Sequence, residues 1–310
     1  MIFGWLQLVF VLIHFTVTED SMIRGKELEE QVYEPEHIQQ VLATTAGNFP
    51  DYFTSFAEQP LKHVFEEHIQ DHAKEQKVYR EYLSLEALEE FETAPSGFKS
   101  HTRKNCPIIR RCLNSQDEVM KAYHRSWGRV TGRELLDAVH NIAKFGLLYV
   151  AHFNDKEHEA AATHDLGVEP LNDGKYGCGG VIGYGIQSSL LYGLHPRNFA
   201  HRSQDAVWSL YFLSGRQDFG LADGSEFLMV HSDLGTCEQN YFYPAELFGF
   251  YALKVFIMLK SACKKLRITL YDPYRYIYLS AFCDHVADTH RADILVFKQS
   301  SEYVENQPWF

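Results

Sequence analysis

The sequence has few of the motifs that reveal a function directly. Its six cysteines form no C-x-x-C pair, which excludes the usual spacing of a zinc ribbon or a dithiol redox site. It contains no G-x-S-x-G nucleophile motif and no P-loop, because the glycine-rich stretches lack the lysine that a P-loop needs. No asparagine lies in an N-x-S/T sequon, which disfavours a glycosylated secreted protein. We therefore expect reduced, mostly buried thiols, and we predict no cofactor.

A metal site is not expected either. The stretch from His152 to Asp165 is rich in histidine and acidic side chains, which are common metal ligands. Its spacing matches no zinc motif, and His158 and His164 do not share one face of a helix. The stretch is predicted to be a solvated acidic loop.

A long hydrophobic run occurs only at the beginning of the sequence. Residues 1–17 are almost entirely apolar, but they lack the basic start and the small-residue cleavage site of a secretory signal. The run is also shorter than the roughly 20 residues that span a bilayer. Residues 1–21 are predicted to be an apolar extension or a buried terminal helix, with an anchor as the alternative. We expect a cytoplasmic protein without firm membrane association; export or membrane anchoring through residues 1–17 is the alternative.

Positive charge is scarce overall, since the net charge is −12, but it is unevenly distributed. Residues 1–95 hold 6 Lys or Arg and 18 Asp or Glu, whereas residues 96–145 hold 10 and 4. Such a basic stretch favours contact with phosphates. The alternative is that it neutralises the acidic part, whose helices are also a candidate site for a basic protein partner.

The predicted fold class is α+β and mostly α-helical. Apolar residues recur at helical spacing through most of the chain, and Ser84 and Thr131 are expected to cap helices. A helix that follows Ser203 is expected to end at Gly215. Strands are predicted in the stretches SEFLMVHS, RITLYD and DILVFK. The predicted parts are an acidic helical region (22–95), a central helical region (96–215) and a smaller α+β region (216–310), with the first boundary at Ala94-Pro95-Ser96-Gly97.

The stretch Ile182-Gly183-Tyr184-Gly185, followed by the small residue Ser189, has a distinctive pattern. It resembles the helix-hairpin-helix element of DNA-repair glycosylases. The resemblance implies that Gly183 and Gly185 let backbone N–H groups at a helix N-terminus approach a DNA phosphate. The alternative is a structural turn between packed core helices.

The resemblance is local and fails at the catalytic position. A proline-and-aromatic turn and another helix follow the hairpin, as in the glycosylases, but the catalytic aspartate position aligns with Ser203. Asp205 lies two residues later. Because base excision needs a carboxylate to support the developing sugar cation, we do not expect glycosylase activity.

The sequence therefore predicts a protein that contacts DNA or RNA through its central region. Tyr123 and Trp127 lie four residues apart, on one helical face, and are candidates for stacking on bases. The alternatives are an enzyme with a small-molecule pocket in the C-terminal α+β part and a protein–protein interaction module, so whether the chain is an enzyme stays open. The residues predicted to bind nucleic acid are Gly183, Gly185, Ser189, Arg110, Arg111, Arg125, Arg129 and Arg202.

Overall fold

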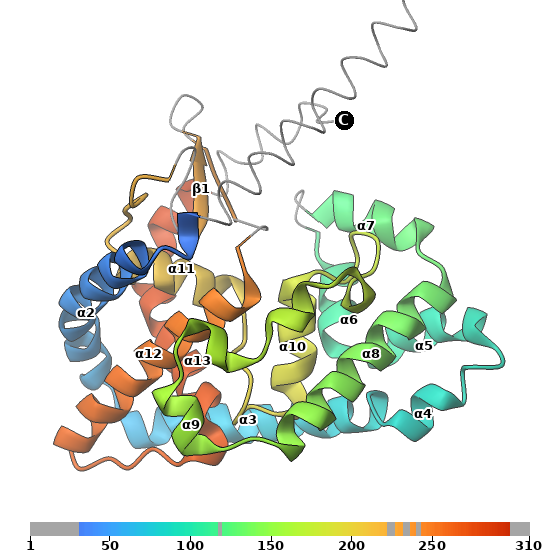
Figure 1. The fold of residues 1–310 in the computed structure, drawn as a ribbon, viewed down its shortest axis with the longest axis horizontal. Coiled ribbons are helices and arrows are strands. Elements are labelled where there is room, and N and C mark those ends of the chain that lie inside the picture. Colours follow the sequence, from blue (N-terminus) through green and yellow to red (C-terminus); the bar gives the residue numbers. More distant parts are fainter. Residues whose placement is uncertain (1–30, 117–119, 222–226, 232–235, 240–242, 298–310) are drawn as a thin grey trace, which may run out of the picture.

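The computed structural model describes residues 31–116, 120–221, 227–231, 236–239 and 243–297. Helices form nearly all of its regular structure, as predicted (Figure 1). The longer α-helices are α2 (Pro35–Ala57), α3 (Leu61–Tyr82), α8 (Gly132–Ala151), α10 (Tyr184–Leu194), α11 (Gln204–Leu213), α12 (Ala245–Lys265) and α13 (Arg275–Thr289). The shorter ones are α4 (Leu85–Glu89), α5 (Phe98–Asn105), α6 (Pro107–Asn114), α7 (Met120–Arg129) and α9 (Asp155–Ala160). The 3-10 turns are η1 (Pro95–Gly97), η2 (Thr163–Leu166), η3 (Glu169–Asn172), η4 (Gly174–Tyr176) and η5 (Asp272–Tyr274).

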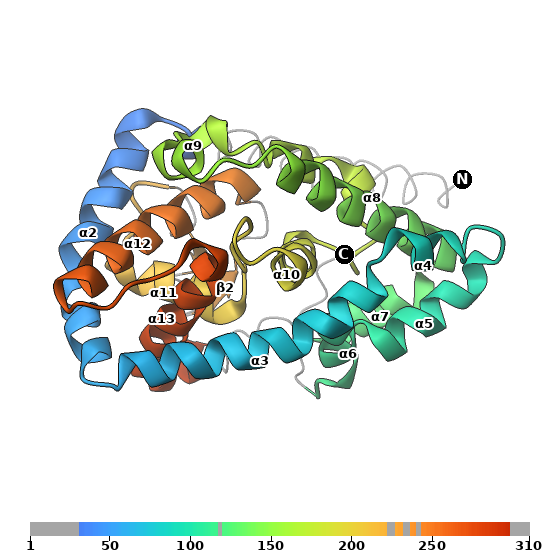
Figure 2. The same ribbon diagram turned by 90° about the horizontal axis from the view of Figure 1, so that it is seen from below.

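The two ends of the described chain pack together. The N-terminal helix α2 contacts α11, α12 and α13, and α13 packs along α11. Helices α4 to α7 gather at the other end of the molecule (Figure 2). The long helix α3 joins the two ends, since it contacts α13 as well as α5 and α6. Helix α10 lies in the middle, packed against both α3 and α8.

Local sequence sets several helix ends. Thr131 and Glu134 form a reciprocal capping box at the start of α8, and the Ser84 hydroxyl caps α4. Helix α11 ends at Leu213, and Gly215 follows in the left-handed conformation with φ 71°. These three sequence predictions are confirmed.

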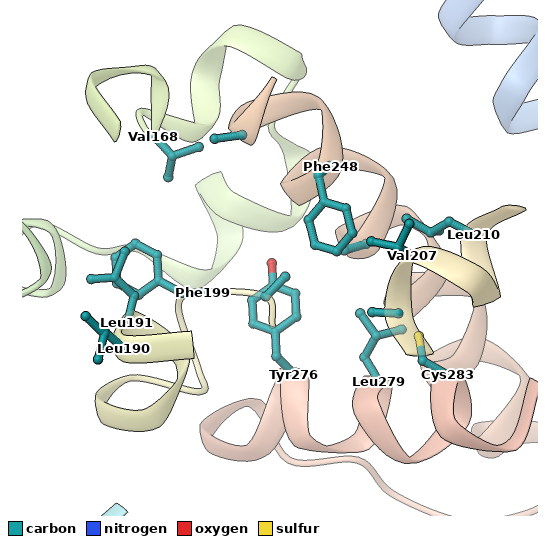
Figure 3. Packing of buried hydrophobic residues seen from close by; sticks show 14 of the residues in the cluster. Val168, Leu190, Leu191, Phe199, Val207, Leu210, Phe248, Tyr276, Leu279 and Cys283 are labelled. Carbon is teal, nitrogen blue, oxygen red and sulfur yellow. The ribbon is translucent and has the colours of Figure 1, made fainter. Parts of the chain in front are cut away.

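The core is rich in aromatic rings. Figure 3 shows Tyr276 of α13 in the middle of the buried cluster, with Phe199 on one side and Phe248 of α12 on the other. Leu279 continues the same face of α13 toward Leu210 of α11 (Figure 3). Helices far apart in the sequence thus meet through a single apolar cluster.

The predicted C-terminal α+β part is not supported. The short strands β1 (Leu228–His231) and β2 (Thr236–Gln239) pair only with each other, and β1 falls inside the predicted stretch SEFLMVHS. The stretch RITLYD is a loop that leads into η5. Residues 293–297 of the predicted strand DILVFK are helical, and its last residue lies outside the described ranges. Short apolar runs favour strands only where a partner strand is present, and packing against helices decides otherwise here.

The predicted boundary near residue 95 coincides with η1, where close contacts link the two sides. Arg133 forms an ion pair with Glu92 at 2.6 Å. The N-terminus of α8 approaches η1 so closely that a Cβ on Gly132 would lie 2.0 Å from the Pro95 carbonyl oxygen. A glycine is therefore required there.

The predicted apolar segment at residues 1–21 lies outside the described residues. Within the described ranges, no helix has the length and apolar character needed to cross a bilayer.

Candidate nucleic-acid interface

Three neighbouring helices at one end of the molecule carry cationic side chains and, in their described residues, no acidic one. We call this region the basic surface: the described residues of α5, α6 and α7, which are 98–116 and 120–129. These residues include eight Lys or Arg and no Asp or Glu. The three helices lie together because α6 packs against both α5 and α7.

Helical amphipathicity places the cations outside. In α6, Pro107 and Ile109 are buried while Arg110 is exposed, and in α7 Trp127 is buried while Arg125 is exposed. The exposed cations that make no ion pair with any other described residue are Arg103, Lys104, Arg110, Arg125 and Arg129. Three of the predicted arginines are therefore available to an anionic ligand.

Three cations of this surface, Lys99, Arg111 and Lys121, make contacts within the protein. Arg111 donates a hydrogen bond to Glu75 of α3 at 2.6 Å, so part of the acidic region reaches the basic surface. Lys99 turns inward, donating to the Val130 carbonyl at 2.7 Å, with its ammonium 5.6 Å from the centroid of the Trp127 ring. The Trp127 ring is thus buried, so it cannot stack on a base. The prediction that it does so is wrong.

The glycine hairpin adjoins the basic surface. A β-bridge pairs Cys178 with Ile182, and Gly179 and Gly180 turn between them with φ values of 31° and 71°. A Cβ on Gly180 would lie 2.7 Å from the Ser126 hydroxyl, so the hairpin backbone packs directly on α7. The hairpin therefore approaches the helix that carries Arg125.

Gly183 and Gly185, the two glycines predicted to approach a phosphate, have a different role from Gly179 and Gly180. Gly183 is the N-cap residue of α10 and Gly185 lies in its first turn, and neither has a positive φ. A Cβ would meet nothing within 4 Å at Gly183 and only the Arg202 carbonyl, at 3.8 Å, at Gly185. Sequence reasoning missed Gly180, although the pair of adjacent glycines before the motif was a signal. The element directly before the hairpin is the turn η4 rather than an α-helix.

Two of the residues predicted to bind nucleic acid, Ser189 and Arg202, need correction, because their side chains lie in the protein interior. Ser189 is buried; its hydroxyl bonds to the Gly185 carbonyl at 2.8 Å and to His201 Nε2 at 2.9 Å. Burial lowers the pKa of His201 to about 4, so the imidazole is neutral at neutral pH. Arg202 is only 5% exposed, with its guanidinium 5.3 Å from the Tyr184 ring centroid. Neither side chain reaches the surface of the protein.

The position aligned with the glycosylase aspartate has a structural role. The Ser203 hydroxyl accepts a hydrogen bond from the Ala206 backbone and caps α11. Asp205 lies in the first turn of α11 and pairs with Arg291 at 3.5 Å.

The stretch after His152, predicted to be a solvated acidic loop, contains α9 and η2. Its side chains His152, Glu157, His164 and Asp165 are exposed, whereas Asp155 and His158 make internal contacts. Buried His158 hydrogen-bonds the Tyr276 hydroxyl at 2.8 Å, and burial lowers its pKa to about 3. Asp155 pairs with Arg197 and Arg275. Within the described ranges no group of three or more His, Cys, Asp or Glu side chains is arranged to hold a metal ion.

The interior near these residues has little free space. A cavity lined by Tyr149, His158, Ser188 and Asn198 among others measures about 20 Å³, which is room for one water molecule. Ligand pockets for drug-sized molecules are typically at least 300 Å³. This cavity therefore gives no support to the small-molecule enzyme alternative.

Comparison of this chain with family models, with curated proteins and with solved structures found no match in any of the three.

Proposed function

We propose that this protein binds nucleic acid through the basic surface of α5 to α7 and the adjoining glycine hairpin. One observation carries the proposal: eight cationic residues and no acidic one occupy the described part of these helices, in a chain of net charge −12. A local concentration of unpaired cations against such an acidic background is typical of a site for a polyanion.

The proposed contacts are with the phosphate backbone rather than with base edges. Arg and Lys contacts to phosphates position a protein without reading sequence, and they supply most of the affinity. The hairpin lies beside α7, so the N-terminus of α10 and the exposed Gly183 are positioned to approach the same backbone. With Trp127 buried, base stacking is not part of the proposed mode.

A salt titration of the full chain tests the proposal. Binding to fluorescent duplex DNA, single-stranded DNA and RNA is measured by anisotropy over a range of salt concentrations. If all five unpaired cations contact duplex phosphates, log K falls with log[salt] at a slope of about −4.5, since each contact contributes about −0.9. Absence of binding at low salt, or a slope near zero, contradicts the proposal.

The hairpin glycines allow a matched pair of substitutions. Gly180→Ala places a Cβ at positive φ and against Ser126, so we expect it to lower the free energy of unfolding by about 1–3 kcal/mol. Gly185→Ala has space and an ordinary φ within α10, so stability should stay equal or rise by up to about 1 kcal/mol. Thermal unfolding by circular dichroism distinguishes the two variants.

The same two variants test whether the glycine hairpin contacts a phosphate or is only a structural turn. If the first turn of α10 approaches a phosphate, a Cβ at Gly185 should hold the phosphate away and weaken DNA binding at every salt concentration, with the salt slope unchanged because no charge is removed. Unchanged DNA binding by Gly185→Ala would limit the interface to the arginines.

The interaction-module alternative rests on the acidic helices. Helices α2 and α3 contribute Phe56, Phe65 and Tyr79 to the core, so deletion of the acidic region would unfold the protein. Such a deletion therefore cannot test the role of the acidic helices. A charge change at Glu75, the residue that pairs with Arg111, is the usable probe.

A further inference from the structure

A second group of exposed cations lies at the opposite end of the molecule from the basic surface. It follows the C-terminus of α12, where the chain turns through residues 266–271 and η5 into α13 (Figures 1 and 2). We call residues 264–274 the α12–α13 turn. Its exposed cations are Lys264, Lys265 and Arg267, and none pairs with another described residue.

Exposed apolar side chains accompany these charges. Leu266 is 49% exposed, Tyr271 62% and Tyr274 39%. Leu266 lies between Lys265 and Arg267 in the sequence, so an aliphatic side chain and two cations share the tip of the turn. Large apolar side chains that face solvent beside unpaired cations are typical of an interaction surface.

The nearby carboxylates do not neutralise the turn. Asp272 accepts a hydrogen bond from Lys260 at 2.8 Å and also lies 3.7 Å from the buried guanidinium of Arg275. Lys260 pairs in addition with Glu159 at 2.7 Å. Lys264 lies one helical turn beyond Lys260 and has no such partner. The carboxylates of Asp272 and Glu159 are therefore already paired, and they leave Lys264 without an anionic partner.

The turn has a defined conformation. The Ile268 backbone donates to the Cys263 carbonyl at 2.9 Å, and Arg267 closes this helix end with φ 61°. Glycine is usual at such a position, because a side chain is strained there. Lys264 and Lys265 also complement the dipole of α12, but Arg267 lies beyond the helix and its charge has no such role.

We propose that the α12–α13 turn docks on an anionic lipid bilayer. Charge complementarity selects the occupant, because unpaired Lys and Arg bind acidic headgroups while Leu and Tyr insert at the interface. Leu266 at the tip favours a bilayer over a nucleic acid, because an aliphatic side chain offers no stacking surface to a base. This surface is separate from the proposed nucleic-acid interface and does not depend on it.

Vesicle co-sedimentation of the full chain tests this inference. The wild type should bind vesicles that contain phosphatidylserine, bind them less at high salt, and bind pure phosphatidylcholine weakly. The triple variant K264Q/K265Q/R267Q should lose about a hundredfold in affinity for the acidic vesicles, at about fivefold for each charge. Every variant retains residues 1–17, so any contribution from that apolar segment is constant across the comparison.

A single substitution supplies a control for folding. Arg267→Gly removes one charge and relieves the positive φ, so it should weaken vesicle binding about fivefold while the melting temperature stays equal or rises.

Leu266→Ser together with Tyr271→Ser should reduce vesicle binding with the charge unchanged. Equal binding of the triple variant and the wild type to acidic vesicles overturns the inference. So does a triple variant that loses nucleic-acid binding and keeps lipid binding.

Discussion

Replacing Arg275 with methionine is expected to lower the free energy of unfolding by about 3–5 kcal/mol, measured by urea denaturation. Its side chain is fully buried, and its guanidinium donates to Asp155 at 2.9 Å and to the Arg197 carbonyl at 2.7 Å. Glu159 lies 3.5 Å from the same guanidinium. Methionine cannot replace these hydrogen bonds, and it leaves the Arg197 carbonyl without its buried donor.

Arg197→Met is the matched control, since Arg197 pairs with the same carboxylate from an exposed position. It should cost at most about 1 kcal/mol. Adding Asp155→Asn to Arg275→Met should restore little of the loss, because Asp155 keeps its ion pair with Arg197. Equal destabilisation by Arg197→Met and Arg275→Met would show that burial of Arg275 is not the cause.

The pH dependence of stability provides an independent check on this cluster. Hydrogen bonds from Arg197 and Arg275 lower the pKa of Asp155 from 3.8 to about 2. A carboxylate with a lowered folded-state pKa stabilises the fold above its ordinary pKa, and this contribution is lost as the pH falls through the folded value. As the pH falls from 3.8 to about 2, the free energy of unfolding of the wild type should therefore decrease more steeply than that of Asp155→Asn.

The triple variant R110Q/R125Q/R129Q is expected to bind duplex DNA about 500-fold more weakly at 0.1 M salt. The estimate follows from three lost phosphate contacts, each of which contributes about 0.9 to the salt slope. All three side chains are exposed, so the melting temperature should be almost unchanged. Anisotropy titrations measure both the affinity and the reduced slope.

Two variants control for net charge. K264Q/K265Q/R267Q removes an equal number of positive charges from the opposite end of the molecule. Its affinity for DNA should stay within about twofold of the wild-type value at 0.1 M salt, since distant charges are screened. Glu75→Gln releases Arg111 and should strengthen binding, the opposite direction. If both triple variants weaken DNA binding equally, net charge rather than the basic surface explains the affinity.

Local sequence was sufficient to predict much of the helical structure. Helix starts at Thr131 and Ser84 and the end at Gly215 depend on side chains and glycine within a few residues of the helix ends. The division into an acidic part and a basic part is likewise a property of composition, and the structure keeps the basic residues together on α5 to α7.

The candidate site was only partly predictable. Exposure of Arg110, Arg125 and Arg129 agrees with the sequence, because a short amphipathic helix buries its apolar side and leaves its arginines outside. The burial of Arg202 and Ser189 was not predictable, since it depends on where α10 packs against helices distant in the sequence. The close approach of Gly180 to Ser126 joins segments more than 50 residues apart and has no local signal for its partner.

The sequence by itself therefore determined the helix-rich class, the ends of several helices and the charge of each part, because these depend on short-range periodicity and capping. Only the tertiary structure decided which polar residues remain at the surface and whether an apolar run is a strand, a loop or a helix. The stretch RITLYD illustrates this: its composition favours a strand, but no strand lies beside it, and it becomes the turn that joins α12 to η5. Strand formation requires a partner for its backbone hydrogen bonds, and that partner is supplied only by the fold.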